Sequence, residues 1–247
     1  MEGNKDDEEI RLKRLRNRVK TLQKKPQPEQ RTPEWYAARH TRVTASEAAS
    51  CLFKSQRMCE EYVKAFDIKT FKYKDTEPLN HYETKEDYII KKCSAFYGKN
   101  VFKDSVYTLW GKKYEEVANR LYCQLNNTTV IEFGLLPHPR LKWLAASPDG
   151  ITPDGIMLEI KCPKSRKIDE TQVPIHYWVQ TQIQLEVTDL DFCDFFECEI
   201  EELETHLLKG KGLYLGTENW PLQAESNIIT QHFLFKQAWG NHSYDTA

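Results

Sequence analysis

Apolar residues recur at helical spacing in three stretches of the chain. Residues 10–25 carry one narrow stripe of Leu12, Leu15, Val19 and Leu22 among basic side chains, which predicts a helix with a single apolar side. Residues 106–125 and 174–187 have an apolar residue every three or four positions, so helices are expected there too. Two shorter helices are expected to begin at Thr32-Pro33-Glu34 and at Thr44 or Ser46.

The second half of the chain contains short segments rich in residues that favour strands. They are residues 130–136, 141–146, 155–161 and 192–200. Thr152-Pro153-Asp154-Gly155 predicts a tight turn before the third segment. Residues 54–105 are rich in Lys and Tyr and poorly patterned, which favours irregular helices. The order of elements predicts an α/β fold with a small central mixed sheet flanked by helices.

Composition narrows the class of protein. The 247 residues are 40% hydrophobic and 29% charged, which is typical of a globular domain and excludes wholesale disorder. The net charge of −2 excludes a uniformly basic nucleic-acid coat but allows a local basic surface. No apolar run is long enough to span a membrane, and the first residues are acidic. We therefore expect an intracellular protein of the cytoplasm or nucleus, not secreted, with seven reduced cysteines.

The distribution of charge and proline along the chain suggests that it has three parts. Residues 1–28 are expected to form a basic N-terminal helix and a linker that ends at Pro26-Gln27-Pro28, residues 29–205 the core, and residues 206–247 an extension that packs on the core. The basic helix has two interpretations. It either docks through its leucine stripe, or its arginines contact phosphate or a partner.

The candidate chemistry lies around Asp149, Glu159 and Lys161. Asp149 and Glu159 are equally far from Asp154, so a hairpin centred on that turn places the two carboxylates opposite each other, ~5 Å apart at Cβ. Strand alternation puts Glu159 and Lys161 together on a polar face whose back is buried. Two facing carboxylates need a cation between them, either a divalent metal or Lys161. The spacing alone is equally compatible with a surface turn beside an exposed strand.

The flanking residues add a family resemblance. Asp149, Glu159 and Lys161 resemble the PD-(D/E)xK nuclease core, and with their flanks they resemble the lambda-exonuclease (YqaJ-type viral recombinase) family. The matching blocks, in order, are Trp35 with Arg39 and Val43-Thr44-Ala45-Ser46, Trp110-Gly111 with Tyr114-Glu115, Ser147-Pro148-Asp149-Gly150, Leu158–Pro163, and Tyr177 with Gln180 and Gln182. The resemblance implies a restriction-endonuclease-like core.

The resemblance also implies roles for individual residues. Asp149, Glu159, Glu115 and the Ile160 carbonyl would hold one or two Mg²⁺ or Mn²⁺ ions, and Lys161 would position the attacking water. Gln182 is the glutamine that the motif favours at the site. Gln180 and Gln182 are ~200° apart on a helix, so Gln180 shares the opposite face with Gln184 and only one of the two faces can line the site. Gln180 and Gln184 could equally be interhelical polar residues.

Arg39, Ser46 and Ser147 resemble the residues that hold the 5′-phosphate of a DNA end, a role that suits an arginine fork and two hydroxyls. The implied function is a Mg²⁺-dependent DNA exonuclease, 5′→3′ on double-stranded ends, which releases 5′-mononucleotides for recombination or repair. The alternatives are an endonuclease on the same core and a non-catalytic DNA-end-binding module. A homotrimer and a single-strand annealing protein are the implied partners besides double-stranded DNA ends, and no membrane is expected.

Overall fold

The computed structural model describes residues 3–68, 77–80, 82–99, 104–169, 171–200 and 228–234. The helices are α1 (Gly3–Gln23), α2 (Pro33–His40), α3 (Ala45–Cys51), α4 (Gln56–Ala65), α5 (Lys85–Phe96), α6 (Val106–Leu125) and α7 (Ile175–Thr188). The strands are β1 (Val43–Thr44), β2 (Leu136–Pro137), β3 (Leu144–Ala146), β4 (Gly150–Ile151), β5 (Ile156–Lys161), β6 (Phe192–Cys198) and β7 (Ile228–Leu234). The predicted α/β fold with a small mixed sheet is confirmed.

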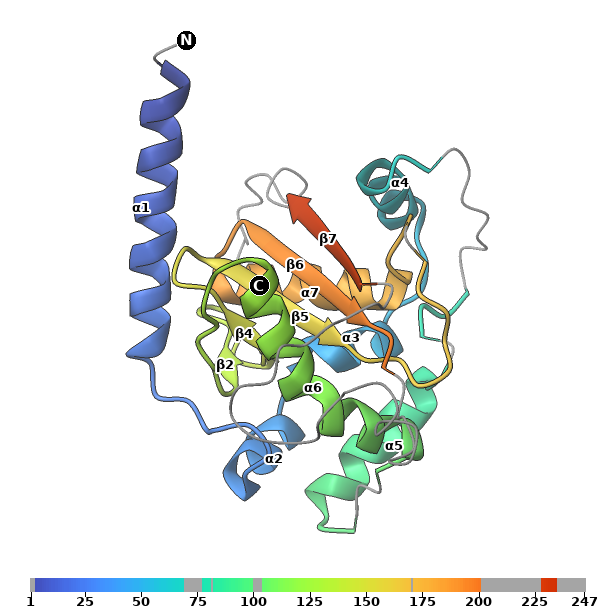
Figure 1. Cartoon of the computed structure of the whole chain (residues 1–247). Coiled ribbons are helices and arrows are strands. Elements are labelled where there is room, and N and C mark those ends of the chain that lie inside the picture. Colours follow the sequence, from blue (N-terminus) through green and yellow to red (C-terminus); the bar gives the residue numbers. More distant parts are fainter. Residues whose placement is uncertain are drawn as a thin grey trace, which may run out of the picture.

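The strands form two small sheets. The larger has the order β4-β5-β6-β7, in which β5 and β6 are parallel and the outer pairs are antiparallel. The smaller has the order β1-β3-β2. In Figure 1, α6 lies in front of the larger sheet and α7 lies behind it. Among the residues with an assigned structure, no helix is long and apolar enough to cross a membrane.

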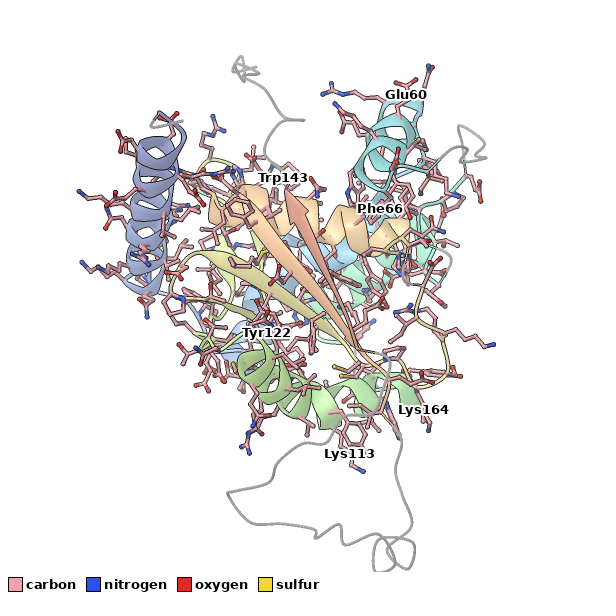
Figure 2. The ribbon with its side chains drawn as sticks, turned by 45° about the horizontal axis from the view of Figure 1, so that its top comes forward. Glu60, Phe66, Lys113, Tyr122, Trp143 and Lys164 are labelled. Atoms are coloured by element: carbon pink, nitrogen blue, oxygen red, sulfur yellow. The ribbon has the colours of Figure 1, made fainter. Side chains whose placement is uncertain are left out.

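Each face of β5 and β6 is buried against a helix. On the α6 side, Tyr122 packs with Leu158 and Phe196, and its hydroxyl donates to the buried Asp194 carboxylate over 2.6 Å. Tyr122 points from α6 toward the sheet in Figure 2. On the α7 side, Met157 and Cys193 belong to a second apolar cluster. Because both faces are covered, a polar side chain on β5 must find its partners inside the protein.

The basic N-terminal helix docks on the core. Leu15, Val19 and Leu22 are buried in the same cluster as Met157, and α1 lies along one side of the molecule in Figure 1. Gly155 turns the chain beneath it with φ +87°, where a Cβ would lie 2.7 Å from that of Leu15. The docked interpretation of this helix is therefore correct.

The arginines of α1 point back to the core as well. Arg11 and Arg14 both donate to Asp191, whose side chain is 3% exposed, and Arg18 donates to the Thr188 carbonyl over 2.6 Å. These contacts occupy the cations that the alternative interpretation assigns to phosphate or a partner.

The expected linker is also fixed to the core. Gly134 N–H donates to Gln27 Oε1 over 2.7 Å, and Leu135 N–H donates to the Pro28 carbonyl over 3.1 Å. Gln30 donates to the carbonyls of Phe133 and Pro148. Residues 27–30 thus run beside residues 133–135, and this places Arg31 at the candidate site. The boundary at residue 28 stays a prediction.

Two expected strands are largely wrong. Residues 130–136 contribute one bridge, Ile131 to Ile151, and the start of β2, while 141–146 form a turn before the short β3. Phe133, Leu136 and Leu144 are buried there and line a connection, whereas Trp143 is 55% exposed. Within the C-terminal extension the structure describes only β7, which adds to the sheet beside β6; the rest of 206–247 lies outside the described residues.

Candidate active site

The hairpin around Asp154 has the predicted register. Gly150 pairs with Leu158 and Ile151 with Met157, so Asp149 comes opposite Glu159 at the open end of the pair. The Ile160 N–H donates to Asp149 Oδ2 over 2.6 Å. This bond fixes the Asp149 carboxylate beside β5. The role of the Ile160 carbonyl as a metal ligand stays a prediction.

Glu159 is buried, which the strand pattern did not predict. Its side chain is 2% exposed because α7 covers this face of β5. Gln180 Nε2 donates to Glu159 Oε1 over 2.6 Å, and Gln184 Nε2 donates to Oε2 over 2.7 Å. Lys161 Nζ donates to the same carboxylate. The polar face expected to be open is in fact an internal hydrogen-bonded network.

The glutamine placement therefore differs from the motif-based expectation. Gln180 and Gln184 are one helical turn apart, and that face of α7 is turned to Glu159. Gln182 lies on another face, where its Nε2 is buried with no hydrogen-bond partner among the described residues. The expectation that Gln182 lines the site is corrected by this geometry.

Lys161 is held as a cation. Burial lowers its pKa, but the charge of Glu159, Tyr177 and Asp149 raises it more, so the net pKa lies above the usual lysine value. Its Nζ also lies 4.8 Å from the centre of the Tyr177 ring. A protonated Lys161 can donate to a water or a phosphate oxygen.

The acidic residues respond to their mutual proximity. Burial, followed by the charge of Glu159, raises the pKa of Asp149 well above its usual value, and Lys161 opposes the shift. Burial also raises the pKa of Glu115, against the opposing charges of Arg31 and Lys161. Negative charge is thus concentrated where Asp149, Glu159 and Glu115 meet, which favours a cation there.

Glu115 is the inward-facing member of its pair on α6. Its Oε2 accepts from Arg31 Nη2 over 2.6 Å, whereas Glu116 is 74% exposed and pairs with Arg120 along the helix surface. The sequence left this choice to the motif match, and the structure turns Glu115 to the site.

The candidate phosphate-binding residues lie together. Arg39 Nη2 donates to Ser46 Oγ over 3.2 Å and its guanidinium stacks 4.3 Å from the centre of the Trp35 ring. Trp35 Nε1 donates to Ser147 Oγ over 2.9 Å. Glu47, which closes the capping box of α3, lies 3.7 Å from Arg39 and orients it. Two helices that follow each other in sequence, α2 and α3, and the distant Ser147 thus converge on one cationic, hydroxyl-rich spot.

One cavity joins this spot to the carboxylates. It has a volume of about 570 Å³, and its lining includes Arg39, Ser46, Ser147, Asp149, Glu159, Lys161, Glu115 and Gln180. A second cavity of about 670 Å³ adjoins it, and Asp149, Glu115 and Arg31 line both. Of the predicted side chains only Gln182 is left outside the first cavity.

The carboxylates form no preformed metal cage. Within the described ranges, no three His, Cys, Asp or Glu side chains are grouped closely enough to hold an ion. Instead, Glu159 accepts from three side-chain donors, Asp149 accepts from the Ile160 N–H and Glu115 accepts from Arg31. The donor set nevertheless fits a hard divalent cation, because three carboxylates line one cavity and a positive charge there would offset the raised pKa values of Asp149 and Glu115.

Residues 34–191 match the YqaJ-like viral recombinase domain. The chain belongs to this family. It is 32% identical over 210 residues to the uncharacterized protein R354 of Acanthamoeba polyphaga mimivirus, a match that covers 78% of this chain and 33% of that protein. The chain therefore spans about a third of the length of this viral relative.

Solved structures show the same fold. The alkaline exonuclease LHK-Exo of Laribacter hongkongensis superposes with a TM-score of 0.55 at 22% identity, over 82% of each chain. A phage-related exonuclease from Haemophilus somnus gives 0.52 at 14% identity, over 81% of this chain and 86% of its own. The family is one of nucleases, which generally depend on a metal ion.

Two site residues were missed from the sequence. Gln184 was left out of the expected site, because its shared helix face with Gln180 left open whether the pair lines the site or lies between helices. Nothing in the sequence around Arg31 marks it as a site residue, because its position depends on the pairing of residues 27–30 with residues 133–135.

Proposed function

We propose that this chain is a Mg²⁺-dependent DNA exonuclease that degrades double-stranded ends in the 5′→3′ direction. The observation that carries the proposal is the shared cavity. Its carboxylates and Lys161 are suited to hydrolysis, and its arginine and hydroxyls are suited to a terminal phosphate. A phosphate pocket beside the hydrolytic residues selects an end without reading bases, since phosphate contacts carry no sequence information.

Each group has a defined task in this proposal. Asp149, Glu159 and Glu115 hold Mg²⁺, which when bound polarises the scissile phosphate and lowers the pKa of a water. Lys161 donates to that water or to the phosphate oxygen on which charge develops. Gln180 and Gln184 keep the Glu159 carboxylate aimed into the site by their hydrogen bonds. Mn²⁺ would be accepted by the same oxygen ligands.

Arg39, Ser46 and Ser147 bind the 5′-phosphate. Arg39 already donates to Ser46, and Trp35 fixes both the guanidinium plane and Ser147. With the terminal phosphate held here, the next phosphodiester reaches the carboxylates, so cleavage releases a 5′-mononucleotide and leaves a 3′ single-stranded tail. Such a tail is a substrate for strand annealing, which supports a role in recombination or repair with an annealing protein as partner.

The test compares linear duplex with closed circular plasmid. Wild type in Mg²⁺ is expected to degrade 5′-phosphorylated linear duplex, to spare the circle and to stop in EDTA. Lys161→Ala is expected to abolish the activity. Lys142→Ala is the matched control, because Lys142 is an exposed lysine that lines neither cavity. A label at the 5′ end that is released before a label at the 3′ end establishes the polarity.

Other outcomes select the alternatives. Rapid cutting of the closed circle would contradict the end pocket and indicate an endonuclease. Salt-dependent binding of DNA ends without turnover would indicate a binding module. Light scattering of the purified chain tests the homotrimer that the family resemblance implies.

A further inference from the structure

Arg31 lies where the two cavities meet. It lines both of them together with Glu115, and its Nη2 donates to Glu115 Oε2 over 2.6 Å. Its side chain is 43% exposed and that of Glu115 is 35% exposed. The pair is therefore accessible from solvent on a path to Asp149, and the guanidinium can move without crossing the protein interior.

The backbone of Arg31 is unusual for a side chain of its size. Its φ of +68° lies in the left-handed region, which costs a non-glycine residue about 1 kcal/mol. Both neighbours are fixed: Gln30 donates to two core carbonyls, and Thr32 caps the N-terminus of α2 by accepting from Trp35 N–H. Glycine would relieve this conformation, so the arginine occupies a backbone position that costs free energy, and from there its side chain reaches the Glu115 carboxylate.

Arg31 and a divalent cation compete for the same group. A carboxylate oxygen that accepts from a guanidinium at 2.6 Å is less available as a metal ligand, and the positive charge beside it repels a second cation. Once the carboxylate binds metal, the guanidinium needs another anion. A phosphate is the anion that the arginine fork fits best, and a DNA strand in the cavities would present one.

We propose that Arg31 exchanges partners during substrate binding: it holds Glu115 until a divalent cation takes that carboxylate, and then binds a phosphate of the DNA strand beside the scissile bond. This inference rests on the proposed function. It assigns to one residue two effects of opposite sign, a weakening of metal binding and a strengthening of DNA binding.

The experiment measures both affinities in the full chain. Arg31→Gly and Arg31→Asn both tolerate the positive φ, so each keeps the turn while removing the charge. Mn²⁺ affinity is measured by calorimetry without DNA. Affinity for 5′-phosphorylated duplex is measured in Ca²⁺, which takes the same oxygen ligands. Mn²⁺ is expected to bind about fivefold to tenfold more tightly to both variants, and duplex about fivefold to tenfold more weakly.

Two controls isolate the exchange. Arg57→Gln neutralises an arginine that pairs with Glu61 along α4, where neither residue lines a cavity, and is expected to change neither affinity. In a Glu115→Gln background, loss of Arg31 is expected no longer to tighten Mn²⁺ binding. Affinities that stay unchanged, or that move in the same direction, would overturn the exchange alone. Failure of every protein, including wild type, to bind Mn²⁺ would overturn the proposed metal-dependent function as well.

Discussion

Gln184 donates from Nε2 to Oε2 of Glu159 over 2.7 Å, and both side chains are almost completely buried. The bond links α7 to the strand that carries Lys161. Because Gln180 donates to the other oxygen, the two amides fix the plane of the carboxylate. Gln184 therefore positions a candidate metal ligand, whereas Gln182 lies on the same helix without a bond to that carboxylate.

Changing Gln184 to Leu should therefore lower both stability and activity. A buried carboxylate that loses a hydrogen-bond donor costs about 1–3 kcal/mol in free energy of unfolding. Nuclease activity should fall because Glu159 is no longer held in one orientation. Urea denaturation and the rate on linear duplex give the two quantities. Gln182→Leu is the matched control, and a larger loss of activity in that variant would restore Gln182 as the site glutamine.

The docking of α1 predicts a stability effect for its arginines. Changing Arg11 and Arg14 to Gln removes two cations from Asp191, which is 3% exposed on its side chain. The free energy of unfolding should fall by about 2–4 kcal/mol, discounted because both arginines are partly exposed. Arg16→Gln, which breaks an exposed pair with Asp154, should change it by less than about 1 kcal/mol.

The salt dependence of DNA binding shows whether the α1 arginines stabilise the fold or contact phosphate. If the arginines serve the fold, the Arg11/Arg14 variant keeps the wild-type salt slope at a temperature where both proteins are folded. A shallower slope in the variant would show that these residues contact phosphate.

Arg39 should determine the preference for a phosphorylated end. Arg39→Lys keeps the charge but loses the planar fork and the stacking on Trp35. The ratio of rates on 5′-phosphate and 5′-hydroxyl duplex should fall by about tenfold, which corresponds to about 1.4 kcal/mol. Arg42→Lys is the control, because Arg42 donates to the Ala38 carbonyl and does not line the cavity. An unchanged ratio in Arg39→Lys would remove Arg39 from the end-binding site.

Much of the fold and of the candidate site could be predicted from the sequence, for reasons that differ from one element to the next. The helix over residues 106–125 and the register that opposes Asp149 and Glu159 follow from local rules of periodicity and turn geometry. The burial of Glu159 could not be predicted, because it depends on α7 folding back over β5. The strand expected over residues 130–136 failed for a similar reason, since apolar side chains are buried there without a partner strand along their length.

Because the pKa of Asp149 is raised, removing its charge should stabilise the fold by an amount that depends on pH. Burial and the neighbouring Glu159 carboxylate raise this pKa well above the usual value, so the folded state binds the proton more tightly than the unfolded chain. Stability from this group is therefore greatest below the unfolded pKa of about 3.9 and is lost as the pH rises through the folded value. Asp149→Asn carries no such loss and can still accept from the Ile160 N–H.

In EDTA, Asp149→Asn should match wild type near pH 4 and should exceed its thermal stability near neutral pH, by about 1.4 kcal/mol for each unit of pKa elevation. Millimolar Mg²⁺ should narrow or reverse the difference, because only wild type keeps all three carboxylates of the proposed metal site. Thermal unfolding from about pH 4 to about pH 8 measures the effect. Asp154→Asn, at a half-exposed turn position, is the control and should not be more stable than wild type at neutral pH. A variant less stable than wild type at neutral pH in EDTA would mean that the Asp149 carboxylate stabilises the fold, which contradicts the electrostatic argument for a cation at this site.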